Sequence, residues 1–167
     1  MSDPPLACFI TFRSYGTWLH GDTRGSVDWA TSGYGHPSLA PNLATERASR
    51  DRLTGPPVAL DDQRRACVER AILQTTTASG WPLHAMNVRT NHVHVVLSGS
   101  TPPERMMTSL KAWSTRRLRE AGLATTNARL WSRHGSTRYL WTETDVARAC
   151  EYVVNGQDGD AEPWAWR

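Results

Sequence analysis

The chain has 167 residues, of which 39% are hydrophobic and 21% are charged. This length can bury one hydrophobic core but not two comfortable ones, so we expect a single domain over residues 1–167. The apolar run near the start contains Asp3 and two adjacent prolines and is too short for a signal peptide or a membrane span, so we expect no membrane partner.

The three cysteines indicate free thiols. Cys8, Cys67 and Cys150 are odd in number, far apart, and each lies beside apolar neighbours. That distribution suits buried thiols better than a disulfide framework. We therefore expect a reducing, cytoplasmic setting.

Positive charge is concentrated in one part of the chain. The formal net charge is only +3, with a sequence pI of about 9.0. Between residues 101 and 141, however, basic residues far outnumber the two acidic ones, Glu104 and Glu120. Such segregation is typical of a surface that binds a polyanion, although an ordinary solvated helix explains it equally well.

The first third of the chain predicts one strand and a long insertion. Residues 8–12 are β-prone and end at a turn-rich stretch, so they form the first predicted strand. Residues 13–58 are rich in Gly, Pro, Ser and Asn and show little periodicity, apart from a short helix expected over 42–53. Connections this long usually have a function, and Trp18 slightly favours a binding cleft over plain surface.

The middle of the chain predicts a helix and a hairpin. Helical spacing of apolar residues runs over 60–78, with Asp61 as the N-cap and Gly80 as the stop. Two β-prone runs follow, 82–88 and 92–98, and their three-residue connection predicts an antiparallel hairpin. We expect this hairpin at the centre of the sheet.

The last third predicts a helix, a strand and a final helix. Thr101 is expected to cap the first of these helices, with Glu104 completing a capping box and Gly122 ending it. Residues 137–141 form the next predicted strand, and Thr142 opens the final helix by the same capping logic. Strands and helices in this order predict an α+β fold.

Two histidines lie two residues apart on a predicted strand. Side chains alternate along a strand, so His92 and His94 share one face, about 7 Å apart along the backbone. Two imidazoles so placed can bind one divalent ion, and a third oxygen donor would favour Mg²⁺ or Mn²⁺. The alternative is that both are ordinary polar residues on an exposed strand face.

The final helix leaves one tyrosine outside its apolar stripe. Tyr152 lies about 120° from the centre of that stripe, so the helix can dock on the sheet without it. A tyrosine can attack phosphorus once its oxygen is activated, whereas Tyr139 on a strand is the weaker candidate. The stripe consists of Val146, Ala149, Cys150, Val153 and Val154.

With these motifs the chain resembles the single-tyrosine HUH transposases, a group that includes the REP-associated tyrosine transposases. The resemblance covers most of the chain. It is strongest at His92-Val93-His94 and at residues 151–157 around Tyr152, and weaker at 9–19 and 131–141. It implies a ferredoxin-like antiparallel sheet with helices packed on one face.

The resemblance also implies a chemistry. His92, His94 and an amide side chain would bind a divalent metal, Mg²⁺ or Mn²⁺, and Tyr152 would attack DNA to form a 5′-phosphotyrosine intermediate. The family commonly has its amide four residues after the tyrosine, where this chain has Gly156. Gln157 could substitute if the helix widens to a π-type turn, and the alternative is a plain C-terminal cap with Gly156 in the left-handed region.

The partner implied is single-stranded or hairpin DNA, bound by a monomer or a homodimer. Two alternatives remain at this point: a domesticated DNA-binding module without catalysis, and a metal-dependent phosphodiesterase that activates water. Basic and aromatic side chains are expected near phosphates or stacked on bases. We assign this role to Trp18, Lys111, Arg116, Arg117, Arg133, His134 and Arg138.

Overall fold

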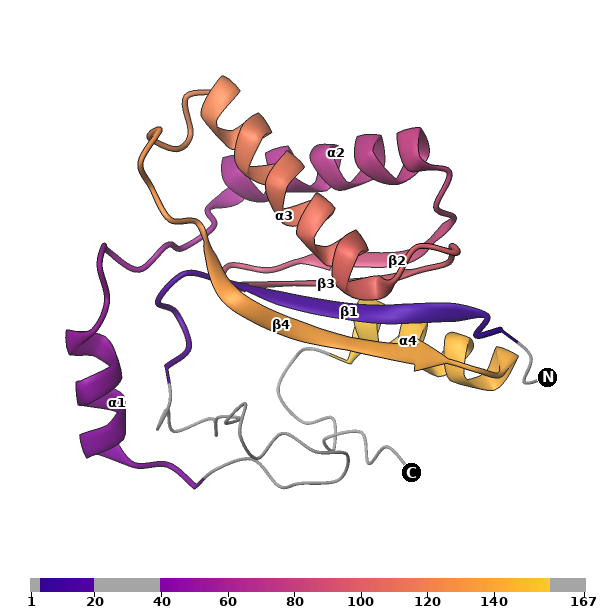
Figure 1. Cartoon of the computed structure of the whole chain (residues 1–167), viewed down its shortest axis with the longest axis horizontal. Helices are drawn as coiled ribbons and strands as arrows, with labels where there is room; N and C mark the ends of the chain where they lie inside the picture. The colour runs from indigo at the N-terminus through magenta and orange to yellow at the C-terminus, as the bar shows by residue number, and fades with distance from the viewer. Residues whose placement is uncertain (1–3, 20–39, 157–167) are drawn as a thin grey trace.

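The computed structural model describes residues 4–19 and 40–156. Within them, an antiparallel sheet with strand order β2-β3-β1-β4 lies between helices (Figure 1). The elements in chain order are β1 Ala7–Ser14, α1 Leu43–Asp51, α2 Asp62–Ser79, β2 Leu83–Val88, β3 His92–Leu97, α3 Pro103–Glu120, β4 Trp131–Leu140 and α4 Glu143–Asn155.

The register of the sheet aligns residues that are far apart in the sequence. On the central strand β1, Thr11 lies opposite His94 of β3 and opposite Ser136 of β4. Asn87 of β2 lies opposite His94 from the other side. These four polar residues therefore form one row across all the described strands, on one face of the sheet.

Each face of the sheet has its own hydrophobic cluster. Ile10 and Phe12 of β1 are fully buried beneath α2 and α3, together with Val93 and Val95 of β3. The alternate residues point the other way and contact α4. This second cluster is small and half of it is alanine: Ala7, Ala85, Val96, Leu140, Ala149 and Val153.

The α+β class and the antiparallel sheet are confirmed, with one difference in the helices. We expected all helices on one face, and α2 and α3 do share a face. Helix α4 covers the opposite face, below the sheet in Figure 1. The physical reason is that β1 and β3 carry apolar residues at successive positions, so both faces need a cover.

Most helix ends are where the sequence predicts them. Asp61 caps α2 by accepting a hydrogen bond from Arg64 N, and Gly80 ends it with a φ of 67°, in the left-handed region. Asn42 caps α1, which confirms the short helix in the insertion. Thr142 forms the predicted capping box with Asp145 at the start of α4.

The cap predicted for α3 is wrong. Pro102 is the N-cap residue, and no side chain caps this end. Thr101 lies one position too early, and its hydroxyl instead accepts a hydrogen bond from Trp81 Nε1 at 3.3 Å. A proline at the start of a helix removes an N–H that would otherwise need a partner, so the side-chain cap is less needed.

Other expectations change in detail. The hairpin is not central, because β2 lies at an edge of the sheet and only β3 is internal. Strand β4 begins at Trp131, six residues before the predicted start. Val154, expected in the buried stripe of α4, is 61% exposed.

The remaining expectations concern cysteines and membranes. All three cysteines are free thiols, with Cys8 and Cys67 buried and Cys150 partly buried. No helix among the described residues is both long and apolar enough to cross a bilayer. The extent of the domain, 1–167 with its insertion at about 13–58, stays a prediction.

Candidate active site

The two histidines of β3 point to the face of the sheet that α4 covers. His92 and His94 have their ring centroids 4.6 Å apart and their ring planes inclined at 69°. Val93 between them points into the opposite core. Strand alternation thus places both imidazoles together, as the sequence predicts.

Tyr152 reaches this pair from α4. Its ring centroid lies 5.8 Å from that of His94, edge-on at 71°. Phe9 of β1 packs against both rings, stacked on His94 at 5.4 Å and edge-on to Tyr152 at 6.0 Å. The phenol and the two imidazoles therefore meet within a single chain, around an aromatic residue that the sequence analysis did not select.

Two contacts hold α4 where Tyr152 can reach the histidines. Ala149 and Val153, both fully buried, pack on the sheet. Asn87 Nδ2 on β2 donates a 2.9 Å hydrogen bond to the carbonyl oxygen of Val153. This bond satisfies one of the carbonyls that the last turn of a helix leaves without an intrahelical partner.

Each imidazole has a hydrogen-bond partner at its Nδ1 atom. Thr11 Oγ1 lies 2.7 Å from His94 Nδ1, across the β1–β3 ladder. His92 Nδ1 donates to the side-chain oxygen of Asn91 at 2.6 Å. Hydrogen bonds at one ring nitrogen fix the orientation of the ring and determine which nitrogen carries the proton.

His94 is neutral in this setting. Burial, and after it the electrostatic effect of His92, Arg13 and Arg89, lowers the pKa of His94 from 6.5 to about 3. Only 8% of the residue is exposed. A neutral imidazole is the form that binds metal ions.

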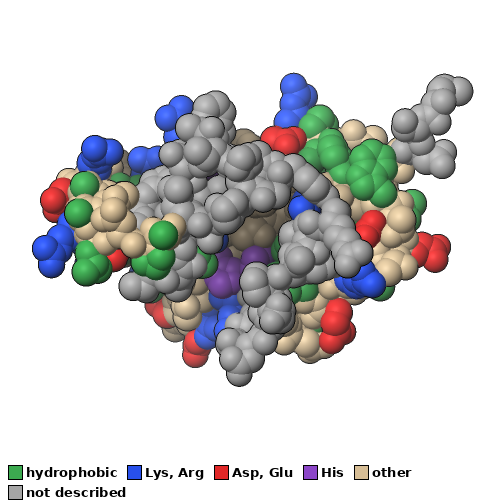
Figure 2. Space-filling model, turned by 90° about the horizontal axis from the view of Figure 1, so that it is seen from below, with side chains coloured by type: hydrophobic (Ala, Val, Ile, Leu, Met, Phe, Trp, Pro, Cys, Tyr) green, Lys and Arg blue, Asp and Glu red, His purple; other side chains and the backbone are tan. Residues whose placement is uncertain are grey.

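Arg13 and Arg89 flank the histidines and were missed by the sequence analysis. Arg13 lies opposite His92 in the ladder, and its guanidinium lies 3.4 Å above the ring of Trp18. Arg89 is joined to His92 through its backbone, N to O at 2.8 Å. Figure 2 looks onto this face, where histidine side chains (purple) are visible beside Lys or Arg side chains (blue).

A known family matches the part of the chain that carries both histidines and Tyr152. The family described as "Transposase IS200 like" matches residues 58–155, more than half of the chain. The chain belongs to the IS200-like transposase family. The matched range ends with α4 and includes both histidines and Tyr152.

Two solved structures share the fold of this IS200-like transposase. One is a REP-associated tyrosine transposase bound to a REP hairpin, with a TM-score of 0.53 and 11% identity over 92% of this chain and 67% of that one. The other is a candidate transposase from Deinococcus radiodurans R1, with a TM-score of 0.51 and 15% identity over 90% of both chains. No curated protein sequence matches significantly.

The end of α4 in this IS200-like transposase remains α-helical. Gly156 N donates to the carbonyl oxygen of Tyr152 at 2.9 Å, the ordinary α-helical spacing. The φ of Gly156 is −84°, so neither the π-type turn nor the left-handed cap considered above is present up to this residue. Asn155 Nδ2 donates to Glu151, and Gln157 lies outside the described residues.

Not all the predicted DNA-binding side chains lie on the face that carries the histidines. Trp18 lies beside Arg13, and Arg138 lies opposite Phe9 and so shares that face. Arg133 and His134 are exposed on β4. Lys111, in contrast, donates to two carbonyl oxygens of β4, those of Ser132 and His134, and burial lowers its pKa.

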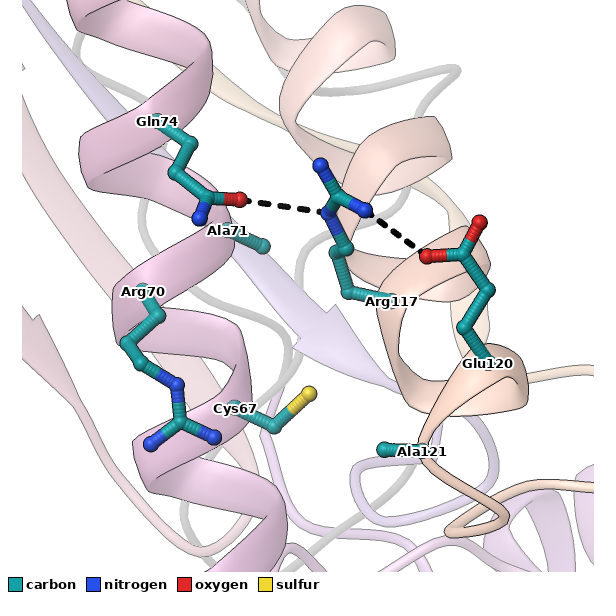
Figure 3. A pocket seen from close by; sticks show the side chains of 7 residues that line it. All are labelled: Cys67, Arg70, Ala71, Gln74, Arg117, Glu120 and Ala121. Atoms are coloured by element: carbon teal, nitrogen blue, oxygen red, sulfur yellow. Dashed lines mark hydrogen bonds and ion pairs between the residues drawn. The ribbon is translucent and has the colours of Figure 1, made fainter.

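Arg116 and Arg117 lie on α3, in the helical layer on the other side of the sheet. Both form ion pairs with Glu120. Arg117 also lines a hollow of about 320 Å³ between α2 and α3, where its Nε donates to Gln74 (Figure 3). Tyr139, opposite Cys8 and 47% exposed, packs beside Trp141 rather than near the histidines.

Proposed function

We propose that this IS200-like transposase is a metal-dependent endonuclease and strand transferase of single-stranded DNA, with Tyr152 as the nucleophile. The observation that carries the proposal is the 5.8 Å approach of the Tyr152 ring to that of His94 within one chain. Packing alone does not explain why the phenol ring lies beside two imidazoles, whereas a role as nucleophile does.

The residues present fit a divalent ion, Mg²⁺ or Mn²⁺. His92 and His94 would hold it through their Nε2 atoms, because each Nδ1 is engaged in a hydrogen bond. No cluster of three His, Cys, Asp or Glu side chains occurs within residues 4–19 and 40–156, so within these ranges a third protein ligand would have to be of another type. Gln157, which follows the described residues, remains our proposal for the third ligand, and because Gly156 N bonds to Tyr152 O in α-helical spacing it would have to reach the ion without a π-type turn before it. A bound ion supplies positive charge to the oxygens of the scissile phosphate.

The chemistry exchanges one phosphodiester bond for another. Tyr152 Oη attacks phosphorus, the bond from phosphorus to the 3′ oxygen breaks, and the phenolic proton ends on that oxygen. The products are a 5′-phosphotyrosine and a free 3′-OH. The reverse attack by a 3′-OH rejoins DNA without water or ATP. We propose that Arg13 and Arg89, which lie near His94, stabilise phosphate charge, while Phe9 packs edge-on against the Tyr152 ring.

The DNA partner is supported by one relative and by charge. The REP-associated transposase of similar fold is bound to a DNA hairpin. In this chain, Arg13, Arg89 and Arg138 lie on or beside the histidine face, as a polyanion requires. We therefore propose single-stranded or hairpin DNA as substrate. A homodimer stays a prediction, and the contact between Tyr152 and His94 does not require one.

A covalent adduct tests the proposal. The protein is incubated with hairpin-bearing single-stranded DNA and Mn²⁺, and we expect a denaturation-resistant complex that is lost in Tyr152→Phe and in wild type with a chelator. Tyr139→Phe is the matched control and keeps the adduct. Cleavage that persists in Tyr152→Phe would identify a water-activating phosphodiesterase instead, and DNA binding without cleavage would identify a binding module.

A further inference from the structure

The two histidines share one feature that their spacing does not explain: both use Nδ1, the nitrogen nearer the backbone, for a hydrogen bond to a neutral side chain. Thr11 Oγ1 lies 2.7 Å from His94 Nδ1, and Asn91 Oδ1 lies 2.6 Å from His92 Nδ1. The two partners come from different places, one from the neighbouring strand and one from the hairpin turn. Each ring is therefore held at the same atom by a separate part of the fold.

The chemistry of these partners determines the proton position. A neutral imidazole carries one N–H and one lone pair, on different nitrogens. The amide oxygen of Asn91 can only accept, so His92 must carry its proton on Nδ1 and keep its lone pair on Nε2. A hydroxyl can donate or accept, so for His94 the same state requires Thr11 Oγ1 to be the acceptor.

We propose that Thr11 and Asn91 are positioning residues that hold both histidines as Nδ1–H tautomers, so that two Nε2 lone pairs face the same ion. The role in metal binding rests on the function proposed above. The tautomers themselves do not, because they are set in the protein before any metal binds. Thr11 thus acts through His94 and would not touch DNA or the metal.

The chain provides a matched control for Thr11. Thr137 is also a threonine on a strand of this sheet, and its hydroxyl donates a 2.7 Å hydrogen bond to Glu104 on the α3 side. Thr137→Val and Thr11→Val therefore make the same change in shape and each removes one hydrogen bond of the same length. A general effect on the sheet would appear in both variants.

The first measurement uses metal-free protein. Nitrogen-15 NMR of the histidine rings reports which nitrogen carries the proton. We expect both His92 and His94 as Nδ1–H in wild type, in Thr11→Ser and in Thr137→Val. In Thr11→Val, we expect the His94 signal to shift toward the Nε2–H state while His92 stays unchanged. Asn91→Leu should shift His92 alone, and Asn91→Asp, which keeps an oxygen acceptor, should not. An unchanged His94 tautomer in Thr11→Val would overturn the proposal.

The second measurement is Mn²⁺ affinity by calorimetric titration, with thermal unfolding as the check on folding. Loss of a hydrogen-bond partner behind a histidine ligand typically lowers metal affinity by about 10- to 100-fold. We expect a loss in this range for Thr11→Val, recovery in Thr11→Ser, and no loss in Thr137→Val. If the wild-type protein binds no Mn²⁺, the metal site of the proposed function is refuted. The NMR measurement would still show which tautomers the two histidines adopt. Full Mn²⁺ affinity in Thr11→Val would overturn the positioning role alone.

Discussion

At the scale of single residues, the absence of a side chain at Gly156 leaves room for Tyr152, the proposed nucleophile. A Cβ placed on Gly156 would lie 2.8 Å from Cδ2 of Tyr152 and 3.0 Å from its Cα. The φ of −84° suits any residue, but the added Cβ would crowd both the ring and the backbone of Tyr152, so Tyr152 would have to shift. We expect Gly156→Ala to slow adduct formation by roughly 10- to 100-fold, because small misplacements of reacting groups are costly.

The control for this prediction is Gly55→Ala, since a Cβ there would meet nothing within 4 Å. Quenched time courses of the phosphotyrosyl adduct give the rate, and thermal unfolding shows whether each variant is folded. Equal rates in wild type and Gly156→Ala would mean that the ring tolerates the added methyl group.

Cys8 is a buried thiol with a raised pKa. Burial, and secondarily the charge of Glu104, raise the pKa of Cys8 from 9.0 to about 11. Its Sγ donates to the carbonyl oxygen of Leu97 in the core. A raised pKa keeps the thiol protonated, and only the thiolate reacts with alkylating agents.

We therefore expect Cys8 to resist iodoacetamide up to pH 9, where a thiol with the ordinary pKa of 9.0 is half ionised, while the partly exposed Cys150 reacts first. Mass spectrometry of peptides after timed labelling follows each site. Rapid labelling of Cys8 in folded protein at pH 8 would contradict its burial.

At the scale of elements, α4 is held on the sheet by a smaller hydrophobic cluster than the one beneath α2 and α3. It packs through a cluster in which three of the six residues are alanines, whereas α2 and α3 cover the larger core. Val153 on α4 and Val68 on α2 are both fully buried. Replacing either with alanine removes two methyl groups from a core, which costs about 2 kcal/mol of unfolding free energy.

The two variants should nevertheless differ in activity. We expect Val153→Ala to lower adduct formation well below the melting temperature, because local undocking of α4 withdraws Tyr152 from the histidines. Val68→Ala should lose similar stability and keep its adduct rate. Chemical denaturation and adduct assays on both proteins make the comparison, and parallel losses of activity would show that α4 does not undock separately.

The sequence predicts these elements well where the signal is local. Asp61, Gly80 and Thr142 mark helix ends because capping depends on neighbours within a few residues. The position of β2 at the edge and of α4 on the far face depend instead on contacts between distant segments. Local patterns do not encode these contacts, and Thr101, expected as a cap, lies one position before the N-cap Pro102 and accepts a hydrogen bond from the distant Trp81 instead.

The candidate site shows the same contrast between local signals and contacts of distant segments. His92, His94 and Tyr152 were identifiable from spacing and from helix periodicity, and the structure brings them together. Thr11 and Arg13 were not identified, because their proximity to the histidines comes from the β1–β3 register across some eighty residues of sequence. Thr11 and Arg13 lie two residues apart on a β-prone run, which places them on one face of a strand. This spacing does not specify the partner strand.

At the scale of the whole molecule, the sheet separates two basic surfaces. Arg13 and Arg89 lie beside the histidines, whereas Arg116 and Arg117 lie on α3 in the opposite layer, paired with Glu120. As the proposed nucleophile, Tyr152 would reach only a phosphate at the histidine face. Arginines on that face that neutralise phosphates release the counterions condensed on the bound strand, and each lost phosphate contact lowers the salt slope by about 0.7 for single strands.

We therefore expect Arg13→Ala and Arg89→Ala each to reduce the slope of log Kd against log salt concentration by about 0.7 and to weaken binding of unstructured single strands. Arg116→Ala should change this slope less, because its guanidinium is paired with Glu120 and lies on α3, on the opposite side of the sheet from the site. Fluorescence anisotropy with a short labelled oligonucleotide over a range of KCl concentrations measures all three. If Arg116→Ala has the larger effect, DNA lies along α3 instead, and only a path around the edge of the sheet could then bring the scissile phosphate to Tyr152.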